Sequence, residues 1–146
     1  MSDAPAPEHE VPAGVDEATV EAVGLVTEAL ETTERARGHL YSFHQLTGSA
    51  DLKLGEAVGR LREAGHGLLA DEIEREMVGR NILPGRWTFQ VVEDYDDTYW
   101  QPFRDMERRV REQLGAGRRH LFEAGMKEDR RTHGHADHTA RPEPGR

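Results

Sequence analysis

The sequence predicts an all-α protein of three long antiparallel helices, a hairpin followed by a third helix. Apolar residues recur at spacings of three and four along most of residues 16–130, which is typical of helices with one buried face. The composition is 36% hydrophobic and 32% charged, so each helix has only a narrow apolar stripe to bury. We expect one helical domain over residues 16–130, between disordered tails at 1–15 and 131–146.

The first two helices are expected to form the hairpin. Asp16 is a suitable N-cap for a helix that runs to about Leu46. In "LTGSAD", Gly48 is expected to end that helix and to start a tight turn. The second helix then extends from about Leu52 to Arg80, antiparallel to the first because the turn is short.

A connector over residues 86–103 leads to the third helix, which is expected to start between 96 and 102 and to reach about Arg130. The run "WTFQVV" favours β-structure but is too short to build a sheet alone. Aromatic residues are concentrated here, and such rings anchor many protein interfaces. We expect them to form a lid, a plug for the helix bundle or an interface for a protein partner: Trp87, Phe89, Tyr95, Tyr99, Trp100.

Charge and composition exclude several classes of function. The net charge of −9 argues against nucleic-acid binding, which requires a dense basic surface. There are no cysteines, so disulfides, thiolate metal sites and thiol nucleophiles are excluded. The sequence contains no apolar run long enough to predict a membrane span, and its first residues do not resemble a signal peptide. We expect a cytoplasmic protein, and the preference for Arg over Lys is typical of GC-rich bacterial genomes.

A possible metal site lies in "REAGHGLLADE", where Glu63 and His66 are three residues apart. On one helix this spacing brings a carboxylate and an imidazole to the same ion. The first helix offers Glu31 or Glu34 as a further carboxylate. The third helix carries the reversed pair, His120 and Glu123. The expected ligand set is therefore Glu34 or Glu31, Glu63, His66, His120 and Glu123.

Over about residues 20–80 the hairpin and its single Glu-x-x-His unit resemble the ferritin-like superfamily. The resemblance implies iron or another divalent metal, held in two-helix members across a dimer. A structural interpretation competes with it, because the helical angle aligns His66 with Gly55 and Gly59 and turns Glu63 toward solvent. Since each helical glycine costs about 1 kcal/mol, we expect these glycines to form a face that another helix approaches closely.

Polar residues interrupt the apolar stripe of the first helix. We expect them to form one hydrogen-bonded cluster, because buried polar groups are costly without partners. A small-ligand pocket is the alternative, since a histidine beside a carboxylate suits proton transfer. These residues are Glu34, Arg37, Tyr41 and His44.

No nucleophile accompanies the polar cluster, so an enzyme is not expected. The first hypothesis is a self-associating homodimer that uses the connector and the glycine face. A ferritin-like metal protein and a small-ligand-binding protein are the alternatives. His133, His135 and His138 in the tail can bind metal only loosely.

Overall fold

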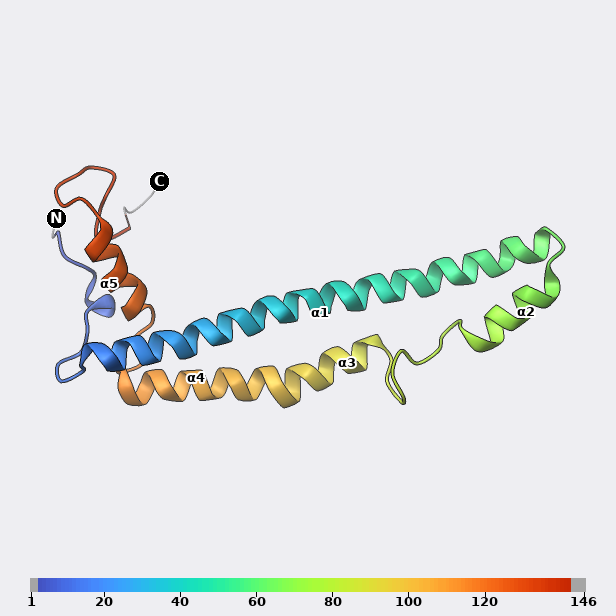
Figure 1. Cartoon of the computed structure of the whole chain (residues 1–146), viewed down its shortest axis with the longest axis horizontal. Helices are drawn as coiled ribbons and strands as arrows, with labels where there is room; N and C mark the ends of the chain where they lie inside the picture. Colours follow the sequence, from blue (N-terminus) through green and yellow to red (C-terminus); the bar gives the residue numbers. More distant parts are fainter. Residues whose placement is uncertain (1–2, 143–146) are drawn as a thin grey trace. The chain divides into compact units, whose positions relative to one another are not determined.

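The computed structural model describes residues 3–142 and is all-α (Figure 1). Its elements are η1 (Pro7–His9), α1 (Glu17–Glu63), α2 (Gly67–Glu76), α3 (Thr88–Tyr95), the π-helical turn η2 (Asp96–Trp100), α4 (Gln101–Leu114) and α5 (Leu121–Arg130). Over the described residues there is no β-strand, only an isolated bridge between Leu83 and Arg86. The chain forms two compact units: unit 1 contains the residues up to Thr32 and from Pro102 onward, and unit 2 is Thr33–Gln101.

Helix α1 begins as predicted but does not stop where the sequence suggested. The Asp16 carboxylate accepts the Thr19 N–H at 2.8 Å, which confirms the N-cap. The expected break at "LTGSAD" is wrong, because α1 continues through Gly48 to Glu63. The segment contains no proline, and one glycine costs a long helix only about 1 kcal/mol. The carboxylate of Asp51, in the same stretch, accepts the Gly79 N–H at 2.7 Å.

The chain reverses at Gly65, inside the stretch that was expected to be helix interior. Gly65 has φ +87°, a conformation that favours glycine over every other residue. His66 N–H donates to Leu61 C=O at 2.8 Å, and Gly65 N–H donates to Arg62 C=O at 3.0 Å. This pair of bonds is the Schellman motif that ends many helices. Gly65 is therefore a helix terminator, and the second helix is the short α2.

In unit 2, α2 returns beside the last turns of α1, and α3 occupies the β-favouring run (Figure 1). Trp87 N–H donates to the Gln90 side-chain oxygen at 2.8 Å and so fixes the start of α3. Thr88, 2% exposed, places its hydroxyl 2.7 Å from His44 Nδ1. These contacts outweigh the β propensity of "WTFQVV", so the third helical segment starts at Thr88 and not between 96 and 102.

The π-helical turn joins α3 to α4, and Gln101 N–H donates to Asp96 C=O, five residues earlier. Pro102, the next residue, has no N–H for the regular helical bond, which accounts for the altered turn at this point. The expected helix to Arg130 is interrupted after Leu114. Ala116 (φ 52°) and Gly117 (φ 72°) are left-handed, and α5 starts afresh at Leu121.

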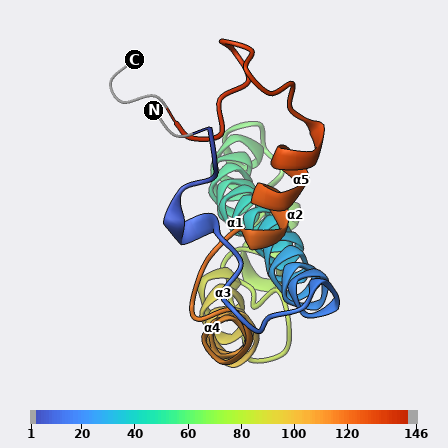
Figure 2. The same ribbon diagram turned by 90° about the vertical axis from the view of Figure 1, so that its left-hand side faces the viewer.

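Unit 1 packs the first turns of α1 against α4 and α5 (Figures 1 and 2). Its buried apolar residues are Val23, Leu30 and Leu121. Glu107 is also buried, at 5% exposure. Its carboxylate accepts the Thr27 hydroxyl at 2.9 Å and Arg111 Nε at 2.6 Å, so its charge is compensated.

The two terminal segments meet at Arg131, whose side chain is 1% exposed. Its guanidinium donates to the Asp3 carboxylate at 2.8 Å, to both Glu128 carboxylate oxygens and to the His138 carbonyl. Hydrogen bonds from Arg131, and then from His133, lower the pKa of Glu128 to about 2. The disorder expected for residues 1–15 and 131–146 stays a prediction, and residues 1–2 and 143–146 lie outside the described residues.

Two glycines of α1 are expected to respond oppositely to alanine. A Cβ at Gly24 would lie 2.8 Å from Phe122 Cβ, so Gly24→Ala should destabilise unit 1 by about 1–3 kcal/mol. A Cβ at Gly48 meets nothing within 4 Å of the same chain, so Gly48→Ala should stabilise the monomeric chain by up to about 1 kcal/mol. Denaturant unfolding of both variants measures the two changes, and equal signs would contradict this packing.

The Arg131 contacts predict an acid-resistant carboxylate. Because the pKa of Glu128 is lowered in the folded chain, its contribution to stability is complete above its ordinary value of 4.5 and is lost as the pH falls toward about 2. Carboxyl carbon NMR should give Glu128 a midpoint of about 2, and Arg131→Gln should raise it. A midpoint near 4.5 in the unmodified chain would instead fit disordered tails.

Candidate functional site

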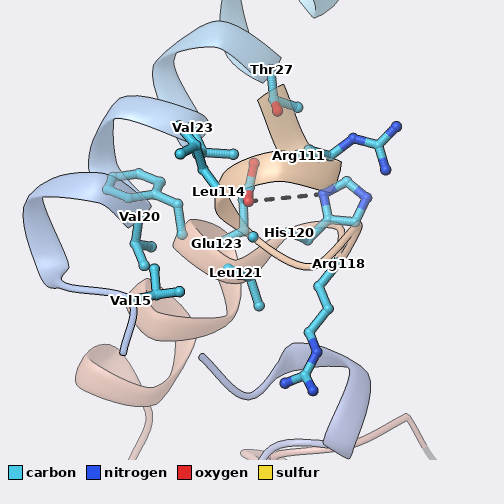
Figure 3. A pocket seen from close by; sticks show the side chains of 13 residues that line it. Val15, Val20, Val23, Thr27, Arg111, Leu114, Arg118, His120, Leu121 and Glu123 are labelled. Atoms are coloured by element: carbon cyan, nitrogen blue, oxygen red, sulfur yellow. Dashed lines mark ion pairs between the residues drawn. The ribbon is translucent and has the colours of Figure 1, made fainter. Parts of the chain in front are cut away.

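Three potential metal ligands converge in unit 1: Glu31 on α1, His120 before α5 and Glu123 in its first turn. One ligand atom from each lies within 4.8 Å of the others. His120 Nδ1 is 3.8 Å from a Glu123 carboxylate oxygen, shown as the dashed line in Figure 3. Glu31 and His120 are exposed and Glu123 is half-buried. The sequence-predicted His120 and Glu123 thus meet Glu31, one of the two carboxylates considered for the first helix.

The other predicted ligands do not join this group. Glu63 is the last residue of α1, whereas His66 is the N-cap of α2 beyond the Gly65 turn. They are therefore not on one helix, so the helical spacing on which the expected convergence rested is absent, and metal binding by Glu63 and His66 stays a prediction. Glu63 is instead 3.6 Å from Arg60, with both side chains more than 70% exposed. Glu34 is exposed as well.

Two hollows border the His120–Glu123 pair. A small cavity of about 10 Å³ lies between α1, α4 and α5, with Val20, Val23 and Leu121 in its wall (Figure 3). An open groove of about 400 Å³ is lined by the pair together with His9 and Glu128. The pair therefore borders a small, mixed apolar and polar cavity on one side and an open groove with further polar side chains on the other.

In unit 2, Arg37 is the centre of the predicted polar cluster. Its Nε and one terminal nitrogen donate to the two Asp96 oxygens at 2.7 and 2.9 Å. The guanidinium carbon lies 3.9 Å from the Trp100 ring centroid and 4.8 Å from that of Tyr41. A terminal nitrogen also donates to the Tyr41 hydroxyl at 3.3 Å. Bidentate pairing and ring stacking together hold the guanidinium in one orientation.

The membership of that cluster differs from the prediction. The carboxylate that pairs with Arg37 comes from Asp96 of the connector and not from Glu34. The requirement that a half-buried arginine have a carboxylate partner was the correct signal, but it does not identify which acid supplies it. His44 contacts Thr88, and its ring meets Tyr41 edge-on, with centroids 6.5 Å apart. A ligand pocket at His44 stays a prediction.

The ion pair shifts the pKa values of both Arg37 and Asp96. The hydrogen bond from Arg37 lowers the pKa of Asp96, and the same bond raises the pKa of Arg37. Their side chains are 21% and 24% exposed, so solvent screens the pair only in part. The contact therefore fixes charge at neutral pH and has no proton to exchange there.

The predicted interaction residues remain accessible in unit 2. Phe89 is 47% and Tyr99 51% exposed. A Cβ added at Gly55 or Gly59 would meet nothing within 4 Å, so the described part of the chain does not cover this side of α1. The remaining connector rings are half-buried: Trp87, Tyr95 and Trp100.

The tail histidines have local partners. His133 Nε2 is 2.7 Å from a Glu128 oxygen, and the His135 and His138 rings have centroids 4.4 Å apart. They lie apart in sequence from the Glu31 group and offer a competing location for a metal.

Comparison of the chain with protein-family models, with curated proteins and with solved structures gave no match. Among the helices of the described region, none has the combination of length and apolar character that crossing a bilayer demands. The functional argument is therefore built on the contacts and exposed surfaces of this chain.

Asp96→Asn should destabilise unit 2 by about 2 kcal/mol, because the neutral amide cannot replace the bidentate ion pair. Since the pKa of Asp96 is lowered by folding, this contribution is present above its ordinary value of 3.8 and is lost as the pH falls through the folded value. Denaturant unfolding at pH 7 and in acid should show the difference from the unmodified chain shrinking. Asp97→Asn, at an exposed neighbour, is the control and should be silent.

Proposed function

We propose that this protein is a non-enzymatic helical protein that forms a homodimer through the glycine-containing side of α1 in unit 2. We define the glycine face as Gly48, Leu52, Gly55 and Gly59, whose spacings of four, three and four place them on one side of the helix. A cytoplasmic location in a bacterium is part of the same proposal.

The glycines of this face carry the proposal. Each one costs the interior of α1 about 1 kcal/mol relative to alanine. None is left-handed, and a Cβ at each would meet nothing within 4 Å. Neither backbone conformation nor packing within the chain therefore explains their presence. Close approach of a helix from another molecule does explain it.

Leu52 supplies the apolar contact for such an approach. It is 77% exposed and is flanked by Gly48 and Gly55. A protruding leucine beside residues without side chains is self-complementary, as a two-fold interface requires. Leu52 of one copy can fill the space over the glycines of the other, and the reverse contact is then also made.

The weak core of unit 2 supports the same proposal. Its buried apolar residues are Val58, Ala70 and Val92. Large apolar or aromatic side chains are exposed in greater number, which is typical of an interaction surface. They are Tyr41, Phe43, Leu52, Leu68, Leu69, Met77, Leu83, Phe89 and Tyr99, while the exposed Leu46 lies on another side of α1 than Leu52.

Light scattering on the full chain tests the proposal. The unmodified protein should be a dimer at micromolar concentration, and Leu52→Lys should weaken it more than about tenfold because a buried ammonium is costly. Leu46→Lys is the matched control: it changes a 70% exposed leucine roughly 120° around α1 and should leave the dimer intact.

Gly55→Ala combined with Gly59→Ala separates folding from association. The double variant should be stabilised as a monomer by up to about 2 kcal/mol and yet dimerise less well. A monomeric unmodified protein would contradict the proposal, and so would dissociation by Leu46→Lys with Leu52→Lys unchanged.

A further inference from the structure

We infer that Glu31, His120 and Glu123 form a binding site for one divalent transition-metal ion of the Zn²⁺ type within a single chain. The inference is independent of the proposed dimer. It rests on the three ligand atoms that lie within 4.8 Å of one another, and on the packing that holds their backbones together.

Buried neighbours fix the two segments that carry the ligands. Leu30, beside Glu31, is 8% exposed, and Leu121, beside His120, is 6% exposed. Gly24 allows α5 to approach α1 closely, since a Cβ there would collide with Phe122. The backbones are thus held by the core of unit 1, while the ligand side chains reach its surface.

The ligand types suit a metal ion that is intermediate between hard and soft, such as Zn²⁺. An imidazole nitrogen and carboxylate oxygens bind Zn²⁺ at about 2.0–2.2 Å, so the three side chains need only a small rotation to close on an ion. Two carboxylates and a neutral imidazole offset the charge of a divalent cation. The positive end of the α5 dipole opposes the cation, but two full negative charges outweigh its half charge.

The surroundings leave a place for the remaining ligands of the ion. The groove of about 400 Å³ opens beside His120 and Glu123, and His9 and Glu128 also line it. Water or one of these side chains can therefore complete the coordination. With three protein ligands and an open position, the arrangement has the donor count of an accessible zinc site and not that of a closed structural site.

A bound metal ion replaces the existing contact between His120 and Glu123, which is weak. His120 and Glu123 are 3.8 Å apart, with side chains 52% and 39% exposed. Exposed pairs of this kind contribute little to stability, so few native interactions are lost when the pair turns to an ion.

The test is calorimetric titration of ZnCl₂ into the full chain carrying His133→Gln, His135→Gln and His138→Gln, which removes binding by the tail. One equivalent should bind per chain. Glu31→Gln, His120→Gln and Glu123→Gln should each weaken binding by more than about tenfold, because each removes a direct ligand.

Matched controls identify the site. Glu34→Gln changes an exposed glutamate of the same helix outside the group, and Glu63→Gln tests the site expected from the sequence. Both should bind Zn²⁺ as the parent does. Absence of saturable binding in the tail-substituted parent would overturn the inference. A loss with Glu34→Gln or Glu63→Gln equal to that with Glu31→Gln would also overturn it.

Discussion

The narrow apolar surface of α1 is the constraint on which the rest of the structure depends. A 47-residue helix contributes only Val23, Leu30 and Val58 to the buried apolar core. Hydrophobic burial of this extent does not fix neighbouring helices in rotation and register. Polar contacts therefore supply the specificity, and each lies where an element must be held against α1.

These polar contacts follow one pattern. Glu107 meets Thr27 in unit 1, Asp96 meets Arg37 in unit 2, and Thr88 meets His44 at the start of α3. Each joins a side chain of α1 to a partner from a later segment. Because an unpartnered charge or hydroxyl at such a position is costly, alternative registers of the helices are disfavoured.

The sequence was sufficient for the class of fold and for local signals. Asp16 acts as the expected cap, because a cap depends only on residues a few positions away. Glycines were harder to interpret, since they occur for three different reasons in this chain. Gly65 adopts a left-handed conformation, Gly24 permits a close helix contact, and Gly48 belongs to the exposed glycine face of α1. Gly48 was expected to end a helix and Gly65 to lie inside one, and both predictions were wrong.

The spacing of apolar residues does not predict which side chains far apart in the sequence contact one another. The run "WTFQVV" favours strand locally, but Thr88 is buried against His44 in a helix. Glu107 carries no local sequence signal of burial, because its partner Thr27 lies 80 positions away. For the candidate metal site, Glu31, His120 and Glu123 were all identified as possible ligands. Which of these residues lie together depends on the end of α4 at Leu114. The 3.6-residue spacing of apolar side chains does not predict that end.

The tie between Arg131 and Asp3 has a consequence for the order of folding. The two residues are 128 positions apart, so this contact forms only after Arg131 has been synthesised. Unit 2 is one continuous stretch, whereas unit 1 combines the two ends of the chain. During translation unit 2 can acquire its structure first. The initial turns of α1 must wait for α4 and α5 before Val23 and Leu30 are buried.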